Sequence, residues 1–288
     1  MVQSTGSGAS GTEASHDEDY DSVMGSIGYL VHASKLVNVD RAHDSWLFDV
    51  DSFVPSKNEA SGVELLSNGI FLGQSAFRIT VENCDLGRPQ YRGGGGNGYS
   101  FHVQGNHSLF ENDSASNARH GFIFNQAVSG NVFHGGKLVS SRLSDDSHRF
   151  LAHANLYEGI ELNGAWLQAV NRGTTSTGGG FTATEHVFWN LHVRKNHASA
   201  QGCAVETAQL GWGYAIGTRA SAGAEAKLCP KSFSNGYWAT LDSGTPPDFV
   251  EGEGMGATLF PQSLYLNQLA ARCVRQKLAC PRLAATPP

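Results

Sequence analysis

A short unit of polar and apolar positions recurs along the chain: a polar residue, a glycine, and then apolar residues spaced by two. Its clearest copies lie at residues 68–72, 97–101 and 120–124. A second polar or glycine position follows fourteen residues after each glycine, at Asn83, Asn112 and Gly135. The interval inside the unit is constant, whereas the gap to the next glycine falls from fifteen residues to nine. A fixed interval with a variable connection is typical of a solenoid, whose turns must match where they stack.

Alignment of the three copies gives columns of apolar residues. One, three and twelve positions after the glycine, these columns are Ile70, Tyr99 and Phe122; Leu72, Phe101 and Phe124; and Val81, Phe110 and Phe133. Residues two apart on a strand share a face, so we expect these columns to form a continuous interior. The next column, Glu82, Glu111 and His134, is expected to face outward. A repeat of about 23 to 31 residues favours a parallel β-helix over a propeller, whose blades take about 40.

The chain is expected to have three parts. Residues 1–25 are rich in Ser and Gly and carry five acidic residues but no Lys or Arg, so this tail is expected to be disordered. The β-helix is expected over 26–245, and a turn-rich segment with a helix over 246–288. Within the last part, residues 262–277 have helix-forming composition with apolar side chains on one face. Such a helix would cover the end of the solenoid and its open strand edges.

The segment from about residue 61 to 220 resembles the right-handed parallel β-helix of the pectin-lyase-like superfamily. Within it, residues 144–156, 166–173 and 186–190 are similar to a subgroup of extracytoplasmic β-helix proteins. The resemblance implies an all-β, right-handed, single-stranded parallel β-helix that is secreted or lies at the cell surface. It also implies polysaccharide as the ligand, and either pectate-lyase-type elimination or glycoside hydrolysis as the chemistry.

Composition adds limits to this picture. The 288 residues carry a net charge of −6, of which the tail contributes five negative charges, so the body is nearly neutral. No apolar run approaches the ~20 residues that a membrane-spanning helix needs. No signal peptide is visible, which leads us to expect part of a longer protein or an imperfect gene model. We expect a polysaccharide partner and no nucleic acid.

The five cysteines have no metal-ligand spacing, so at most two disulfides and one free thiol are expected. No metal or other cofactor is expected from the residues; a requirement for Ca²⁺ stays open, without support from the sequence.

Candidate chemistry gathers between Gly135 and Gly164, where no clean copy of the unit occurs. An insertion at such a place often lines the binding groove of a solenoid, although it can equally be a solvated loop. Asp146 and His148 lie two apart, so in an extended segment the carboxylate would orient the imidazole for proton transfer. His153 is a further candidate. A metal site made by His148 and His153 is disfavoured, because their spacing suits neither a helix nor a strand.

Three further residues are candidates for substrate contacts, together with His120. His120 occupies the position that asparagines hold in the first two copies, so it either continues a ladder of hydrogen bonds or faces the groove with Arg119. Asn171 and Arg172 follow the apolar stretch 166–170 at a strand end. Arg172 is there either an anion clamp or a cap on exposed carbonyls. The two guanidinium groups suit a uronate carboxylate, which arginine binds through two parallel hydrogen bonds.

The predicted function is lyase-type cleavage of a uronate-containing glycan. His148, Asp146, His153 and His120 are the candidate catalytic residues, and Arg119, Arg172 and Asn171 the candidate substrate-binding residues. A glycoside hydrolase would instead need two carboxylates about 5 to 9.5 Å apart, for which Asp146 with Glu158 or Glu161 is a candidate pair. A non-catalytic glycan-binding or cell-surface β-helix is the remaining alternative.

Overall fold

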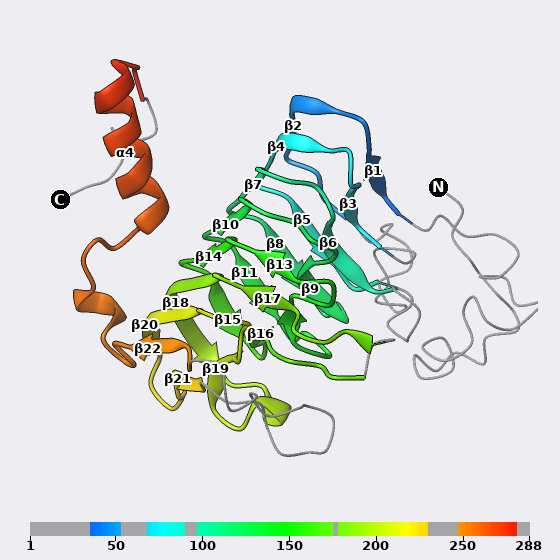
Figure 1. The fold of residues 1–288 in the computed structure, drawn as a ribbon. Coiled ribbons are helices and arrows are strands. Elements are labelled where there is room, and N and C mark those ends of the chain that lie inside the picture. The colour runs from blue at the N-terminus through cyan, green and yellow to red at the C-terminus, as the bar shows by residue number, and fades with distance from the viewer. Residues whose placement is uncertain (1–34, 53–67, 90–96, 175–177, 230–246, 281–288) are drawn as a thin grey trace, which may run out of the picture.

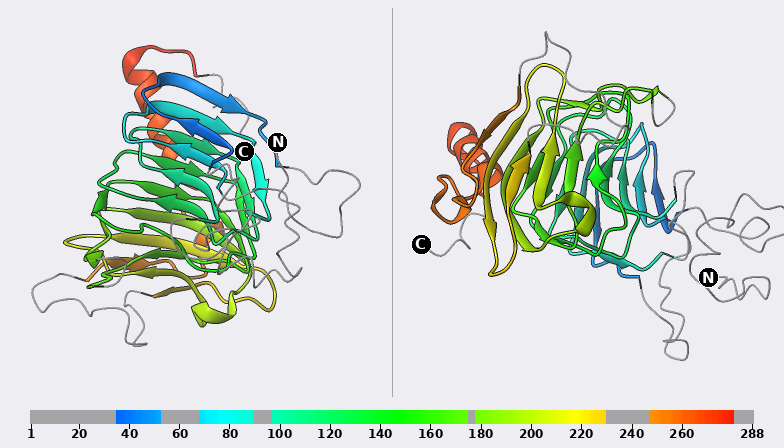
Figure 2. Two further views of the ribbon diagram at one scale, coloured as in Figure 1. Left: turned by 90° about the vertical axis from the view of Figure 1, so that its right-hand side faces the viewer. Right: turned by 90° about the horizontal axis from the view of Figure 1, so that it is seen from below.

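Stacked parallel strands form the body of the protein in a computed structural model, which describes residues 35–52, 68–89, 97–174, 178–229 and 247–280. Figure 1 shows the strands in layers, and Figure 2 shows them following chain order from the blue end to the orange end. The fold is therefore mostly β, with parallel sheets consistent with a solenoid and one C-terminal helix. The tail expected to be disordered lies outside the described residues.

The described strands form three main sheets and one small sheet. The first contains β1 (Val37–Val39), β3 (Ile70–Leu72), β6 (Tyr99–Val103) and β9 (His120–Phe124). The second and largest contains β2 (His43–Phe48), β4 (Phe77–Glu82), β7 (Leu109–Glu111), β10 (Val132–His134), β14 (Leu156–Glu158), β18 (Val187–Lys195), β20 (Tyr214–Ala220) and β22 (Phe249–Glu251), and also β5 (Asp85–Gly87), β8 (Ser114–Ser116), β11 (Lys137–Val139) and β15 (Glu161–Asn163). The third contains β12 (Asp145–Asp146), β16 (Leu167–Ala169), β19 (Cys203–Thr207) and β21 (Lys227–Cys229). A small sheet pairs β13 (Ala152–His153) with β17 (Ala183–Thr184).

The interior column predicted twelve positions after the glycine is confirmed. Val81, Phe110 and Phe133 pair in register on β4, β7 and β10, and the column continues through Tyr157 and Phe188. All five side chains are at most 1% exposed. Parallel register places equivalent side chains directly above one another, so these rings build a continuous core.

The column predicted one position after the glycine is wrong at Tyr99. Ile70 pairs with Phe101, which pairs with Phe122, whereas Tyr99 pairs with His120. The glycines of the first two copies have different roles. Gly98 has φ +75° and belongs to a bend. Gly69 packs too closely for a side chain, because a Cβ there would lie 2.3 Å from the Ser100 carbonyl oxygen. The second copy is therefore offset by two residues in register, so that Phe101 takes the place of Tyr99 in this column.

The polar or glycine position fourteen residues after each glycine of the unit lies in a bend of the chain. Asn83, Asn112 and Gly135 all have positive φ, and each donates its backbone N–H to a carbonyl of the next turn at 2.8 to 3.0 Å. Glycine adopts this conformation freely and Asn tolerates it. Each bend is thus tied to the turn stacked on it.

The interpretation of residues 135–164 as an insertion is wrong. This span contains β11, β12, β13, β14 and β15, each paired with a strand of a neighbouring turn. These strands have only two or three residues, too few to show a period of two in the sequence. The repeat is therefore continued in this region by shorter strands.

The C-terminal helix α4 (Leu264–Gln276) forms where it was expected, but it does not cover the end of the stack. Ser263 caps its N-terminus, accepting the N–H of Leu266 at 3.0 Å. Glu158 of β14 accepts hydrogen bonds from the Ser263 hydroxyl and from the Tyr265 N–H. The helix is therefore attached to the flank of the large sheet, and Figure 1 shows it beside the strands rather than over β22. No helix in the described part of the chain is long and apolar enough to span a membrane.

The cysteines form two disulfides, as the odd count allowed. Cys203 of β19 is bonded to Cys229 of β21, and Cys273 to Cys280, while Cys84 is a buried free thiol.

Candidate functional site

Asp146 is the centre of a buried polar cluster on the outside of β12. It pairs in register with Gln168 of β16, which pairs with Glu206 of β19, so the three polar residues form a row across successive turns. The preceding turn contributes His120 at the start of β9, since β9 and β12 are joined by the Phe124–Ser147 bridge. Residues from several turns therefore meet at this one place.

The side chain of Asp146 contacts three cationic or ionisable groups. Arg172 donates a hydrogen bond to Oδ2, and Nδ1 of His148 lies 3.5 Å from the same oxygen. Nδ1 of His120 lies 3.8 Å from Oδ1. Burial alone would raise the pKa of Asp146, but the positive charge of Arg172, together with the neighbouring imidazoles, outweighs it and holds that pKa well below its usual range. Asp146 is therefore a carboxylate in the folded protein.

His120 is held in one orientation by the backbone. Its Nδ1 lies 2.5 Å from the Ser144 carbonyl oxygen, which can only accept, so Nδ1 carries the proton. Burial lowers the pKa of His120 to about 3, so the ring is neutral and Nε2 has a free lone pair. Within the described residues Nε2 has no hydrogen-bond partner, and neither does Oδ1 of Asp146.

An array of aromatic rings continues the cluster toward β6. The ring of Tyr99 lies 5.0 Å from that of His102 and 5.1 Å from that of His120, both in edge-to-face geometry, and His120 lies 5.7 Å from His148. Burial raises the pKa of Tyr99, and the positive charge of Arg119 acts in the opposite direction. Arg119 therefore belongs to the surroundings of this cluster through its charge on Tyr99.

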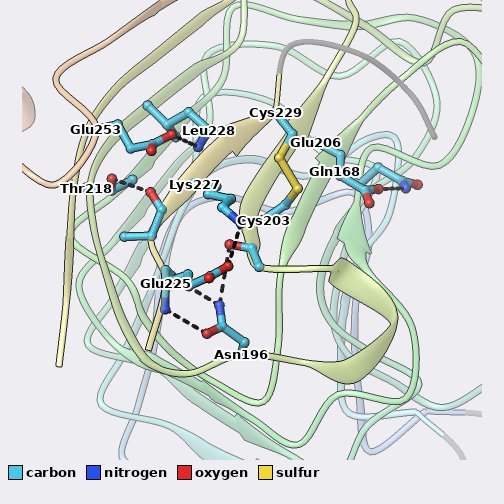
Figure 3. Close-up of a disulfide and its surroundings, with 12 residues drawn as sticks. Gln168, Asn196, Cys203, Glu206, Thr218, Glu225, Lys227, Leu228, Cys229 and Glu253 are labelled. Carbon is cyan, nitrogen blue, oxygen red and sulfur yellow. Dashed lines mark hydrogen bonds and ion pairs between the residues drawn. A yellow bond between two sulfur atoms is a disulfide. The ribbon is translucent and has the colours of Figure 1, made fainter. Parts of the chain in front are cut away.

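Gln168 of the same turn and Glu206 of the following turn lie behind Arg172. Oε1 of Gln168 accepts from Arg172 at 3.1 Å and from the Ser144 hydroxyl at 3.2 Å, and its amide group donates to Glu206 at 2.5 Å. Figure 3 shows this Gln168–Glu206 pair near the Cys203–Cys229 disulfide. Burial raises the pKa of Glu206. The Arg172 guanidinium is thus fixed between Asp146 and Gln168.

The structure brings four of the seven candidate residues together and leaves two elsewhere. His120, Asp146, His148 and Arg172 meet, and Arg119 lies nearby. His153 is exposed on β13, paired with Thr184 in the small sheet. Oδ1 of Asn171 accepts the N–H of Gly173 at 2.9 Å and closes a local turn.

The carboxylates considered for hydrolysis are engaged elsewhere. Glu158 binds the start of α4, and Glu161 of β15 forms a 2.7 Å ion pair with Arg194. Asp145, next to Asp146, points to the opposite face and accepts from the Ser141 hydroxyl at 2.8 Å and the Phe122 N–H at 3.1 Å. Burial raises the pKa of Asp145 to about 7. It is a structural residue that closes the bend beside it.

Four residues of the site were not predicted from the sequence. They are Tyr99, His102, Gln168 and Glu206. Gln168 is the one polar residue in the stretch 166–170, and Glu206 is a charged residue within a strand whose residues are all buried. A polar residue inside a buried strand needs a partner, and this was the signal available for both.

Comparisons with protein-family models, with curated proteins and with solved structures found no match. The resemblance to the pectin-lyase-like superfamily thus remains an expectation from the sequence. What can be inferred about function depends on the geometry of the cluster.

Proposed function

We propose that this chain is a right-handed parallel β-helix of the pectin-lyase-like kind that cleaves a uronate-containing polysaccharide by elimination. The stacked parallel strands support the fold. Two disulfides support a secreted or cell-surface location, because disulfides persist in oxidising compartments. The observation that carries the chemistry is the convergence of His120, Asp146, His148 and Arg172 on one cluster.

Elimination makes two demands that this cluster can meet. As the C5–H and C4–O bonds break and the C4–C5 double bond forms, a proton leaves C5 and the departing oxygen gains one. Negative charge meanwhile grows on the uronate carboxylate. Positive groups must stabilise that charge, and an imidazole is the side chain best suited to proton transfer near neutral pH.

The exposure of the side chains supports a division of roles. The side chain of His148 is 16% exposed, against 2% for His120 and 0% for Asp146, so His148 is the imidazole that reaches the substrate. Arg172 is bound to Asp146 and Gln168 and acts as a positioning residue. Arg119 is partly exposed and its charge reaches Tyr99, so we assign it to the substrate carboxylate.

The test is an assay of uronate and neutral glycans for the ultraviolet absorbance of the new double bond and for new reducing ends. His148→Ala should lower kcat by roughly 10²- to 10⁴-fold, the usual contribution of a positioned acid or base. The matched control is His43→Ala, an exposed histidine on β2, which should leave kcat unchanged. A folded His148→Ala protein with full activity would remove His148 from the mechanism.

A non-catalytic glycan-binding function is the second candidate, favoured by an exposed row of aromatic rings. Phe249 stacks on Trp212 with ring centroids 5.2 Å apart and on Tyr214 at 5.3 Å, with interplanar angles of 17° and 9°. Trp212 is 47% and Phe249 49% exposed. Flat exposed rings suit the apolar faces of sugars. Glycan binding that is lost in Trp212→Ala, without product from any glycan, would favour this function over elimination.

A further inference from the structure

His120, Asp146 and His148 have the composition of a transition-metal site. Each offers one ligand atom, a ring nitrogen or a carboxylate oxygen, and the three atoms lie within 4.8 Å of one another. Two imidazoles with one carboxylate form a ligand set used for divalent first-row metals such as Zn²⁺ or Fe²⁺. Ca²⁺ and Mg²⁺ prefer oxygen ligands throughout, so this set discriminates against them.

Unpartnered polar atoms point to a missing ligand. Nε2 of His120 and Oδ1 of Asp146 are buried without a hydrogen-bond partner among the described residues, although burial of such atoms is costly. His120 is 2% and Asp146 0% exposed. A cation bound by these groups would compensate the loss of their hydration.

The surrounding contacts match those of metal-binding side chains. A histidine that binds a metal commonly donates its other ring nitrogen to a backbone carbonyl, and Nδ1 of His120 faces the Ser144 oxygen at 2.5 Å. A ligating carboxylate is commonly held through its second oxygen, and Oδ2 of Asp146 accepts from Arg172. The positive charge of Arg172 opposes cation binding, but Glu206 behind Gln168 adds a carboxyl group to the same row.

We propose that His120, Asp146 and His148 bind one divalent first-row transition-metal ion of the Zn²⁺ class. The three ligands leave open positions, so the ion is exchangeable and accessible from the side on which His148 is exposed. The inference deepens the proposed function and relies on it only for the substrate: the ion would supply positive charge for a uronate carboxylate. The second ring nitrogen of His148 would then carry the proton and would donate a hydrogen bond to the departing oxygen.

The test measures metal binding to the full chain after treatment with a chelator. Titration with Zn²⁺ by calorimetry should show one saturable site, and Co²⁺ should give the visible absorption of a nitrogen-ligated ion. Asp146→Asn preserves shape and His148→Ala removes a partly exposed ring, so both should fold, and each should weaken Zn²⁺ binding by 10-fold or more. His43→Ala and Glu161→Gln are the controls and should bind as the unmodified chain does.

Two outcomes would overturn the proposal. One is the absence of saturable binding for both Zn²⁺ and Co²⁺, and the other is binding that is unchanged in folded His148→Ala and Asp146→Asn. Glycan cleavage is measured separately on the same samples. Cleavage by metal-free protein would overturn the role of the ion and leave the elimination intact, whereas metal binding without cleavage of any uronate glycan would support the site and contradict the function.

Discussion

Asp113 is buried in the bend between β7 and β8, where its Oδ1 accepts the N–H of Cys84 at 2.8 Å. Burial raises its pKa from 3.8 to about 7, and the charge of Glu82 acts in the same direction. The Cys84 thiol is the other titratable group facing it. The pKa of Asp113 is higher in the folded than in the unfolded chain, so its ionisation destabilises the folded state. This destabilisation is zero below about pH 4 and increases as the pH rises toward 7.

Asp113→Asn keeps the acceptor oxygen and removes the charge. Relative to the unmodified chain, it should therefore be more stabilising at about pH 8 than at about pH 4, by up to about 4 kcal/mol, because each unit of the raised pKa is worth about 1.4 kcal/mol. Urea denaturation at the two pH values measures this difference. The control is Asp51→Asn, an exposed carboxylate whose Oδ1 likewise accepts a backbone N–H, that of Asp85 at 3.1 Å. Equal effects of Asp113→Asn at both pH values would contradict the assignment.

At the residue scale, the sequence predicted which side chains are neighbours within one strand but not which are neighbours across strands. The two-residue spacing of Asp146 and His148 predicted their proximity, and Nδ1 of His148 does lie 3.5 Å from Asp146. Tyr99 and Gln168 enter the same cluster through pairing with neighbouring turns. That pairing depends on the length of each connection, and a misalignment of two residues was enough to place Tyr99 in the core.

Among the elements, α4 is attached to the large sheet at its N-terminal end, in part through one buried carboxylate. Glu158 is 1% exposed and accepts from the Ser263 hydroxyl and from the Tyr265 N–H. Glu158→Ala would leave these donors without their acceptor, and we expect it to weaken the docking of α4 by about 1 to 3 kcal/mol. Hydrogen exchange should then accelerate in Leu264–Gln276 while β4 and β7 keep their protection.

Glu161→Ala is the matched control for this experiment. It removes a neighbouring carboxylate whose ion pair with Arg194 is largely exposed, so it should change little. Unchanged exchange of α4 in Glu158→Ala would show that other contacts hold the helix.

The sequence predicted the long or regularly repeated elements and missed the short ones. The core column from Val81 to Phe133 and the helix near residue 264 were both expected. The strands between residues 137 and 163 were missed, because a strand of two or three residues carries no measurable period. The predicted docking position of α4 was also wrong, because an amphipathic pattern shows that a helix packs against a surface but not which surface it is.

For the whole molecule, the Cys203–Cys229 disulfide links β19 to β21 across 26 residues. Figure 3 shows this bond, and Figure 1 shows β19 and β21 near the C-terminal end of the stack. Cys203→Ser/Cys229→Ser should lower stability by about 2 to 4 kcal/mol, because the bond restricts the unfolded chain. Since each turn contacts mainly its neighbours, hydrogen exchange should increase first near β21 and last near β4.

The second disulfide provides the comparison for this prediction. Cys273 and Cys280 close a loop of only seven residues outside the sheets, so Cys273→Ser/Cys280→Ser should cost less. A uniform loss of protection over all strands in Cys203→Ser/Cys229→Ser would show that the stack unfolds as one unit.

The cluster around Asp146 draws on five successive layers, those of β6, β9, β12, β16 and β19. They contribute Tyr99, His120, Asp146, Gln168 with Arg172, and Glu206. Two further strands of the same faces lie before this group, β1 and β3, and one lies after it, β21. A rod of such layers melts from its ends, where each layer has a neighbour on one side only. The outer layers therefore protect the site: on heating or proteolysis they would unfold or be cleaved before the layers that carry the reactive side chains.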